Sequence, residues 1–429
     1  MRSEMTNNLV SALKADTRIQ DYKVNVSKKE SFELFFVKGK LETMRCTDTC
    51  DRQATVYVDH HGFRGDAQFF VDPSTTVADL EALIAEAAAN AGLIQNPPYS
   101  LPAGETGDYQ VPGNLGDIPM TELAEQISQT VFGATTQQGG SLNAVEVFID
   151  HHVDSVCNSR GLQKTQQRWT AMVEAIPTFN GDRESVELYE QYNFSSLDLT
   201  ALTREISEKM ADVKARYEAV KPDFSLDCPI VLNKLELNDL FTAVADDLNY
   251  ATVYSHSNLM NRGDRLQKQI LGDPITLRMA GSAQGSVAST CFDGDGLSLG
   301  SALLVKDGLV EGYYGSNRFG QYLGLTPTGN LSCLCVDPGT ADETALAGQD
   351  YLEVVSMSGL QVDFFNDYIG GEIRLAYCHR GGQVLPVTGI SISGSLEAVL
   401  SSIRLYRETS VFDGYVGPAK AILDHMKIF

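Results

Sequence analysis

A short acidic turn is the first part of the sequence that could do chemistry. Residues 291–300 read CFDGDGLSLG, with two aspartates one residue apart and a glycine after each. A calcium-binding EF-hand loop needs oxygen ligands at positions one, three and five and a carboxylate at position twelve. Counted from Asp293, positions five and twelve are Leu297 and Leu304, which excludes that loop, and no phosphate-binding loop lies nearby to support phosphoryl transfer. We therefore expect a structural turn, in which the glycines allow the bend and the aspartates accept backbone hydrogen bonds.

Histidines form two Asp-His-His triplets, at residues 59–61 and 150–152. Adjacent side chains of a strand point to opposite faces, so neither the pair His60 and His61 nor the pair His151 and His152 can converge on one ion. One histidine from each triplet could share a zinc ion if the two strands were neighbours. The other reading is solvated histidines on half-buried strands. None of the seven histidines precedes a glutamate, so the His-Glu pair of a zinc-peptidase helix is missing.

Eight cysteines are spread along the chain. Two close pairs lack the second pair that a zinc ribbon requires: Cys46 with Cys50, and Cys333 with Cys335. Cys378-His379 could supply a thiolate and a base, although a nucleophile and its base normally meet through the fold. We expect inert thiols that behave as small apolar side chains. An independent metal-dependent hydrolase, built from the Asp-His-His strands or Cys378-His379, stays open as an alternative.

The elements that position these residues follow from hydrophobic periodicity, glycine and proline. For the first half we predict the following: a hairpin at 54–71 with Gly62 and Gly65 marking the turn, a helix from Val77 that ends before Pro97, a polar loop at 102–116, and strands at 144–156 and 163–179. The clearest helix has an apolar face at spacings of three and four: Leu202, Ile206, Met210, Val213 and Tyr217. It must end before Pro222, because the residue preceding a proline resists helical geometry.

We place a domain boundary at that proline. Residues 1–221 are predicted to form an N-terminal mixed α/β domain. Residues 222–429 contain short β-rich runs joined by turn pairs such as Asp307-Gly308 and Gly381-Gly382, which predicts a β-rich C-terminal domain of many hairpins. The expected fold class is therefore α+β.

The chain is strongly acidic, with 33 basic and 56 acidic residues and a formal charge of -23. This field repels phosphate backbones and anionic membrane surfaces, so we expect neither a nucleic acid nor a membrane as partner. The first residues lack the apolar stretch of a signal peptide, and no segment reaches the ~18 apolar residues that span a bilayer. With scattered cysteines, this predicts a cytoplasmic protein.

Residues 292–330, FDGDGLSLGSALLVKDGLVEGYYGSNRFGQYLGLTPTGN, resemble the signature block of the TldD/PmbA family, also called TldD/TldE. That block has an acidic-glycine turn, a strand, a hairpin, a helix and a closing Thr-Gly-Asn. Residues 351–359 and 381–400 resemble the family's following strand and its Pro-Val block, and residues 55–100 resemble its first-domain hairpin and helix more loosely. By this resemblance, the structural signature residues are Phe292, Asp293, Asp295, Gly296, Thr328, Gly329 and Asn330.

The family has two kinds of subunit. The TldD kind carries a zinc site, with a His-Glu-x-x-x-His helix early in the second domain and a cysteine near the C-terminus. At the corresponding place this chain reads LNKLELNDLFTAVADDL, residues 232–248, without a histidine, and residues 411–429 hold no cysteine. The resemblance therefore implies the TldE (PmbA) kind, a non-catalytic subunit with no catalytic residue, metal or cofactor of its own.

The function implied by the resemblance is that of a zinc metallopeptidase complex, which degrades small or unfolded peptides or matures modified peptide precursors. Zinc is expected in a TldD-type partner that forms a heterodimer with this chain, and a homodimer is expected when the chain is isolated. Residues 354–365 would offer an edge strand to the peptide substrate, with these substrate-binding residues: Ser356, Met357, Ser358 and Gly359. The family's older name, gyrase modulator, leaves a protein that binds DNA gyrase as a further alternative.

Overall fold

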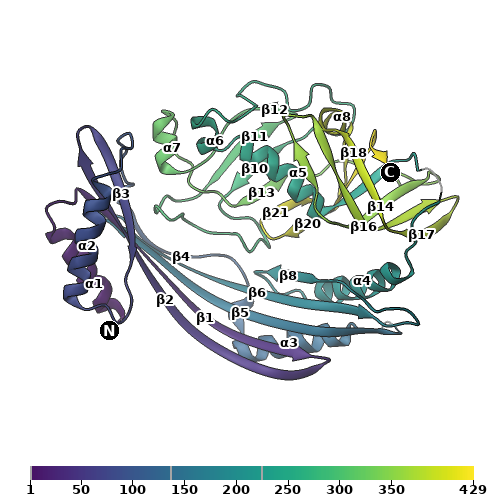
Figure 1. The fold of residues 1–429 in the computed structure, drawn as a ribbon, viewed down its shortest axis with the longest axis horizontal. Helices are drawn as coiled ribbons and strands as arrows, with labels where there is room; N and C mark the ends of the chain where they lie inside the picture. The colour runs from purple at the N-terminus through teal and green to yellow at the C-terminus, as the bar shows by residue number, and fades with distance from the viewer. Residues whose placement is uncertain (1, 136–137, 224–225) are drawn as a thin grey trace.

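The fold consists of a long curved sheet and, above it, a β-rich half (Figure 1). A computed structural model of the chain describes residues 2–135, 138–223 and 226–429. Helices and strands are mixed throughout, which confirms the predicted α+β class. None of the described helices combines the length and the apolar character that crossing a bilayer requires.

Within the described residues, eight strands form the N-terminal sheet, in the order β3-β2-β1-β5-β6-β4, with β7 and β8 also paired to β6. These strands are β1 (Asp21–Val37), β2 (Lys40–His60), β3 (Phe63–Phe70), β4 (Thr106–Gln110), β5 (Gly140–Asn158), β6 (Gln163–Phe179), β7 (Val186–Glu187) and β8 (Glu190–Phe194). The four longest contain 17 to 21 residues, so each extends for roughly 60 Å at about 3.3 Å per residue. They form the curved layer at the bottom of Figure 1.

Helices pack on this sheet in two groups. They are α1 (Arg2–Ala15), α2 (Val77–Ala91), the 3₁₀ turn η1 (Leu115–Asp117), α3 (Met120–Gly133) and α4 (Leu199–Glu218). The first two share a hydrophobic cluster with one end of β1, β2 and β3, whereas α3 and α4 share another with β5 and β6. Helix α2 starts where Thr76 and Asp79 form a capping box, which satisfies amide groups that the first turn leaves free.

The two faces of the long sheet differ because side chains alternate along a strand. In β5, Val145, Val147 and Ile149 are buried in the cluster with α3 and α4. The residues between and beyond them, such as Asp150 and His152, lie on the opposite face, which looks toward the C-terminal half. One face therefore supplies stability, and the other is free to carry polar groups.

The C-terminal half contains two further sheets in the described residues. The six-stranded sheet has the order β12-β11-β10-β13-β21-β20, and the nine-stranded sheet has the order β19-β22-β9-β14-β16-β18-β23, with β15 and β17 also paired to β16. The strands are β9 (Ile230–Asn233), β10 (Leu277–Ala280), β11 (Ser301–Lys306), β12 (Leu309–Val310), β13 (Cys333–Val336), β14 (Tyr351–Met357), β15 (Gln361–Asp363), β16 (Tyr368–Arg380), β17 (Gln383–Val387), β18 (Ile390–Ser395), β19 (Arg404–Leu405), β20 (Thr409–Phe412), β21 (Tyr415–Pro418), β22 (Lys420–Leu423) and β23 (Lys427–Ile428).

One hydrophobic cluster joins both of these sheets to helix α5 (Lys234–Asp247). Shorter helices complete this half: α6 (Tyr250–Tyr254), α7 (Asn317–Tyr322) and α8 (Leu396–Ser402). Leu237, Leu240, Phe241 and Val244 of α5 are fully buried in the cluster. Their helical spacing places them on a continuous apolar stripe, which explains why α5 lies in the core rather than on the surface.

The predicted elements agree with the structure except at two places. The 54–71 hairpin, the helix from Val77, the paired strands β5 and β6 and the long helix α4 are confirmed. Gly65 is not in the hairpin turn but inside β3, where an added Cβ would lie 1.7 Å from the Ala91 carbonyl oxygen. It is needed because α2 approaches the strand closely. The expected loop at 102–116 contains β4, which pairs in parallel with β6.

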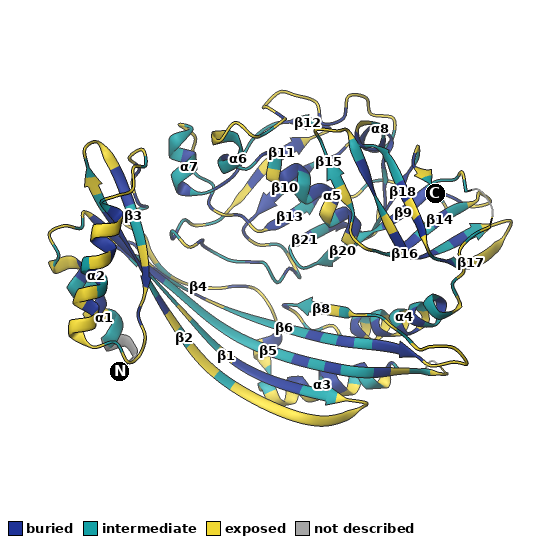
Figure 2. Ribbon diagram, viewed as in Figure 1, coloured by how far each residue is buried: buried dark blue, intermediate teal, exposed yellow. Residues whose placement is uncertain are grey.

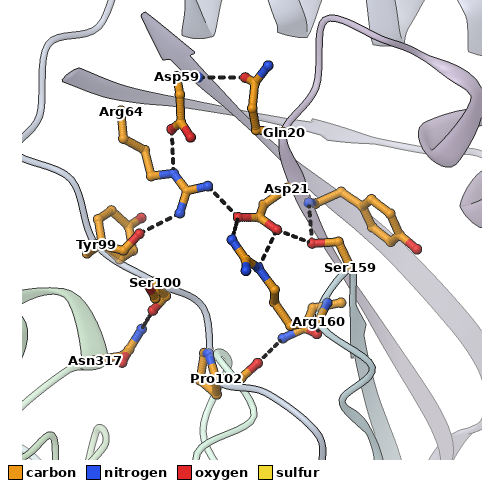
Figure 3. A network of polar contacts seen from close by, with 12 residues as sticks. Gln20, Asp21, Asp59, Arg64, Tyr99, Ser100, Pro102, Ser159, Arg160 and Asn317 are labelled. Atoms are coloured by element: carbon orange, nitrogen blue, oxygen red, sulfur yellow. Dashed lines mark hydrogen bonds and ion pairs between the residues drawn. The ribbon is translucent and has the colours of Figure 1, made fainter. Parts of the chain in front are cut away.

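A buried ionic network fixes one end of the long sheet (Figure 3). Asp21 is 2% exposed, and its carboxylate accepts hydrogen bonds from Arg64, from both Nε and Nη2 of Arg160, and from Ser159 Oγ. Burial favours a raised pKa for Asp21, but the hydrogen bonds from Arg160, Ser159 and Arg64 outweigh it and lower the pKa. Arg64 also donates to the Tyr99 carbonyl oxygen. The network thus ties β1, β3, the β5–β6 turn and the loop after α2 together.

We predict that Asp21→Asn destabilises the protein by roughly 3–5 kcal/mol at pH 7, because it leaves the Arg64 and Arg160 charges without their shared counter-charge. Urea-induced unfolding measures this loss. Asp342→Asn is the matched control, since the pair of Asp342 with Arg407 lies at the surface and such pairs contribute little.

The same prediction has a pH dependence. A carboxylate whose pKa is lowered by folding stabilises the protein above its ordinary pKa of 3.8, and this contribution is lost as the pH falls through the lower folded-state value. The difference between wild type and Asp21→Asn should therefore shrink in that acidic range. An equal stability of the two proteins at pH 7 would contradict the role of the network.

Candidate functional site

The Asp-Gly turn fastens the two ends of the 292–330 block. Asp293 is buried, and its Oδ1 accepts the amide hydrogens of Asp295 and Leu297, each at 3.0 Å. Its Oδ2 accepts the amide hydrogen of Asn330, also at 3.0 Å. Burial raises the pKa of Asp293, and these amide donors oppose that shift. With all three bonds directed at backbone, this carboxylate has the geometry of a fold element and not of a reaction centre.

The same turn is also a joint between the two halves of the chain. Lys23 Nζ of β1 lies 2.5 Å from Asp295 Oδ1, and Asn25 Nδ2 donates to the Gly294 carbonyl oxygen at 3.2 Å. Phe292 packs in a small hydrophobic cluster with side chains of the long sheet. We call this set of contacts the Asp-Gly joint.

Two glycines and Thr328 hold the backbone of the 292–330 block in its conformation. Gly296 has φ +84°, and an added Cβ would lie 2.5 Å from Leu162 of the long sheet. Gly329 has φ +81°, and its added Cβ would lie 2.3 Å from Leu299. Thr328 Oγ1 accepts the amide hydrogen of Gly315 at 2.9 Å. A side chain at either glycine would therefore strain the backbone and push neighbours apart.

The segment expected to bind substrate lies where β14 ends. The predicted edge at 354–365 is covered over its first two residues: β14 pairs with β16 on one side, and on the other Asn233 Nδ2 donates to the carbonyl oxygens of Val354 and Val355. Ser356 Oγ is buried without a hydrogen-bond partner among the described residues. Ser358 bonds to β16 through its amide and its hydroxyl group, so a proline there would break the sheet.

Met357 and Gly359 belong to the same segment, and neither lines the two hollows described below. Met357 pairs with Ile373 of β16 and packs against the main C-terminal core, while Gly359 has φ +128°. A depression of about 590 Å³ lies nearby, between α5, α6 and β15. Two of its three carboxylates, Asp247 and Asp363, accept backbone hydrogen bonds from neighbouring loops, and burial raises the pKa of the third, Asp246.

A second hollow, of about 370 Å³, lies between the polar face of the long sheet and the C-terminal half. Its floor and wall come from β5, β6 and β8, and its roof comes from two loops of the C-terminal half. The lining residues are Asp150, His152, Arg168, Thr170, Ala171, Met172, Asn193, Val287 and Asp413. We call this hollow the inter-half cleft, and charged groups from β5 and β6 converge there.

Polar contacts organise the cleft. Lys29 Nζ of β1 lies 3.1 Å from Asp150 Oδ2, and His152 Nε2 lies 3.2 Å from Thr170 Oγ1. Burial is the main cause that lowers the pKa of His152, to about 4, and the charge of Arg168 adds to it. The histidine is therefore neutral at pH 7, and the cleft contains two cations and their carboxylate partners.

The roof is joined to the floor by one polar contact in the cleft. Asn193 Nδ2 of β8 donates to Asp413 Oδ1 at 2.8 Å, and the Asp413 carbonyl oxygen accepts from Ser286 Oγ at 2.7 Å. Asp413 has φ +49°, a conformation that Asp tolerates better than most residues in tight turns. Hydrogen bonds thus position the β20–β21 turn over β8.

The two Asp-His-His triplets do not meet. Strand β1 separates β2 from β5, and Asp21 pairs with Tyr57 whereas Glu30 pairs with His151. His60 lies three residues beyond Tyr57, so the triplets are about twelve residues, or about 40 Å, apart along the sheet at about 3.3 Å per residue. His60 bonds to the Ile94 carbonyl oxygen, and His151 stacks on Trp169. The hypothesis of a shared zinc ion between these strands is wrong, because it required the strands to be neighbours.

Cys378 and His379 point to opposite faces of β16, as neighbours in a strand must. His379 stacks on Tyr351 and lies 3.1 Å from Glu353 Oε2. Cys378 is buried, and burial raises the pKa of its thiol, which disfavours the reactive thiolate. These two residues do not form a nucleophile and its base.

Helix α5 occupies the place where the resemblance would put a zinc-binding helix. Its sequence, KLELNDLFTAVADD, has no histidine. Glu236 in its first turn is 5% exposed, and burial raises its pKa to about 7. In the described part of the chain, no three His, Cys, Asp or Glu side chains are grouped so that they could bind a metal ion.

Sequence reasoning missed the inter-half cleft. The alternation of Asp150, His152 and Asp154 in β5 was a usable signal, because period-two polar residues indicate a face that is not in the core. The partners Lys29 and Arg168 could not be assigned, since they come from β1 and β6 and depend on the register of two strand pairs.

Comparisons with known proteins relate the chain to peptidases and to gyrase modulators. Residues 225–429 match the family described as PmbA/TldA metallopeptidase C-terminal domain. A metalloprotease PmbA homolog from Haemophilus influenzae is 27% identical over 203 residues, which cover 45% of this chain and 44% of that protein. The chain spans about half the length of the curated relatives it matches.

Solved structures share the whole fold. TldE from Thermococcus kodakarensis superimposes with a TM-score of 0.79 at 14% identity, over 99% of both chains. A protein from Thermotoga maritima named as a modulator of DNA gyrase gives a TM-score of 0.75 at 15% identity, over 100% of both chains. At this identity the likeness shows the fold alone.

We predict that His152 makes the protein less stable as the pH falls from 6.5 toward 4. In this range His152 is protonated in the unfolded chain but stays neutral in the folded protein, so the unfolded state binds more protons. The free energy of unfolding therefore decreases by up to about 3 kcal/mol. The pH dependence of urea unfolding measures the effect. His152→Gln should flatten it, whereas the exposed-site control His61→Gln should not. Identical profiles for wild type and His152→Gln would contradict the prediction.

Proposed function

Because the chain is a TldD/PmbA family member, we propose that it is the TldE-like, non-catalytic subunit of a two-subunit zinc metallopeptidase. The observation that carries this proposal is helix α5, which holds no histidine at the place of the family's zinc-binding helix. A TldD-type partner would supply the zinc ion and the general base. This chain would supply binding surface for short or unfolded peptides.

The surface that favours assembly is the outer part of β2. Residues 40–51 pair with β1 on one side, whereas on the other side Val71 donates to the Arg52 carbonyl oxygen and β3 pairs with β2 from Gln53 onward. This stretch is exposed along most of its length (Figure 2), and it carries Leu41 and Met44, which are 52% and 60% exposed. A long free edge with apolar side chains is a template for strand pairing with another chain. We propose that it binds the TldD-type subunit, and a second copy when the chain is isolated.

The inter-half cleft supports the proposed contact with peptides. It lies on the face of the long sheet that the helices leave uncovered, and its polar groups come from separate strands. A cleft between a rigid sheet and a second layer suits an extended chain. The complex would thus bind substrate partly on this subunit and cleave it at the zinc ion of the other.

A second candidate function rests on the name of a solved structure. The Thermotoga maritima protein is named as a modulator of DNA gyrase, and a chain with a charge of -23 would bind basic protein surfaces in preference to DNA. Capture of purified gyrase by this chain at physiological salt without nucleic acid would support this candidate, and no capture would remove it.

We predict that the purified chain alone does not cleave unstructured peptides, and that adding the TldD-type subunit from the same genome produces cleavage. A zinc chelator should abolish this activity and added zinc should restore it. Elemental analysis of the isolated chain is the companion measurement. Stoichiometric zinc in the isolated chain together with chelator-sensitive cleavage would overturn the proposed division of roles.

We predict that lysines on the outer part of β2 weaken assembly. The double variant Leu41→Lys and Met44→Lys places charge on the free edge, as natural edge strands do to prevent pairing. Light scattering should show a shift toward monomer, alone and after mixing with the TldD-type subunit. Leu93→Lys is the control, because Leu93 is 79% exposed and lies outside this edge. Unchanged assembly of the double variant would show that the partner binds elsewhere.

A further inference from the structure

The inter-half cleft contains an unpaired donor and an unpaired acceptor on neighbouring strands. Asp150 Oδ1 and Arg168 Nε are both buried, and neither has a hydrogen-bond partner among the described residues. Arg168 Nε lies 3.7 Å from Asp154 Oδ2, which is within ion-pair range but too long for a hydrogen bond. Buried polar groups are normally hydrogen-bonded. Two unpaired atoms in one hollow therefore indicate a bound molecule that supplies the missing hydrogen bonds.

Surrounding contacts orient both side chains. Asp150 is oriented through its other oxygen, since Lys29 Nζ lies 3.1 Å from Oδ2. Asp154, which faces Arg168, is itself oriented by Ser27 Oγ, which donates to Oδ1 at 2.7 Å. The side chains of Asp150 and Arg168 line the cleft and are 16% and 26% exposed. Their two unpaired atoms are themselves covered, so a small rotation of each side chain is needed to bring these atoms to a ligand.

The register brings the two groups to the same face. Arg168 of β6 is opposite His152 of β5, and Asp150 is two residues from His152 on the same strand, so all three side chains share one face. Val287 and Asp413 close the hollow from above. Its volume of about 370 Å³ lies in the range of ligand sites in proteins, about 300–1,000 Å³.

Charge decides which ligand chemistry fits. An anion would be attracted by Arg168 and Lys29 but repelled by Asp150 and Asp154, whereas a cation would be repelled by the first two residues and attracted by the other two. A neutral main chain offers both kinds of group, because the N–H and the carbonyl oxygen of one residue in an extended peptide point to the same side. These two groups can satisfy both unpaired atoms without introducing a charge. Main-chain amides of an extended peptide present these groups at regular intervals.

We propose that the inter-half cleft binds an extended peptide through its main-chain amides, with a peptide carbonyl oxygen accepting from Arg168 Nε and a peptide N–H donating to Asp150 Oδ1. This inference deepens the proposed function and rests on it for the choice of peptide as ligand. His152 stays neutral beside the peptide and bonds to Thr170, so it adds no charge to the site.

The first test measures binding of a fluorescein-labelled decapeptide of mixed sequence, acetylated and amidated at its ends, to the full-length chain by fluorescence anisotropy. Asp150→Leu and Arg168→Met should each weaken binding at least about tenfold, the loss expected for a hydrogen bond to a charged group. Glu146→Leu is the matched control for Asp150, because it lies on the same strand and face. Arg204→Met is the control for Arg168, because Arg204 is 66% exposed and forms only a surface pair with Glu208 on α4.

A second test needs no variant and so does not depend on its folding. The same peptide is N-methylated at one position at a time and measured against the wild-type chain. We expect at least one methylated position to bind at least about tenfold more weakly, because the methyl group removes the N–H that Asp150 accepts. With Asp150→Leu, this sensitivity should disappear.

Several outcomes would overturn the proposal. They are no binding to the wild-type chain, equal binding by all N-methylated peptides, equal losses in the controls, or binding of the peptide free acid but not of its amide. The last would identify a carboxylate site at Arg168.

If the isolated chain binds the peptide as expected but forms no active complex with a TldD-type subunit, then the proposed function fails and the peptide site remains. If the complex cleaves peptides while Asp150→Leu and wild type bind equally, the proposed function remains and the peptide site fails.

Discussion

The buried carboxylate of Asp293 is the interaction on which the rest of the arrangement depends. Its three hydrogen bonds to backbone amides hold the Asp-Gly turn closed and tie that turn to Asn330. Because the turn is closed, Asp295 can form its ion pair with Lys23, and Phe292 can pack against the long sheet. A carboxylate that is 7% exposed is costly to bury unless it is fully bonded, so the turn geometry and the joint between the halves stabilise one another.

A second joint explains why a cleft exists at all. At the other end of the sheet, Tyr377 of β16 donates to Asp212 of α4 at 2.9 Å, and Lys234 of α5 lies 3.2 Å from Glu205 of α4. The long sheet is thus connected to the C-terminal half near both of its ends. Between these joints its polar face is spanned by few contacts, of which the bond of Asn193 to Asp413 is one. The inter-half cleft is the space that this two-ended attachment leaves.

How much the sequence could predict depends on the range of the interaction. Local patterns were enough for α2, α4 and the strands β5 and β6, since apolar spacing and prolines act within a few residues. The failures involve contacts between distant segments. The Asp-His-His triplets could share a zinc ion only if their strands were neighbours, and β1 lies between those strands. The predicted loop at 102–116 contains β4, because the five residues of β4 gain their hydrogen bonds from β6 alone. Composition could not reveal Lys29 beside Asp150, because register decides it.

The two faces of the long sheet separate stability from binding. On one face, Val147, Ile149 and Val173 are fully buried with the helices, and burial of such side chains stabilises the fold by about 1.5–3 kcal/mol each. On the other face, Asp150 and Arg168 keep buried atoms without hydrogen-bond partners in the described chain, and each such atom costs about 1–3 kcal/mol. Apolar residues of similar size would remove that cost, and the first face shows that this sheet accommodates them. The cost of the unpaired atoms on the polar face is therefore explained if a bound ligand supplies their hydrogen bonds.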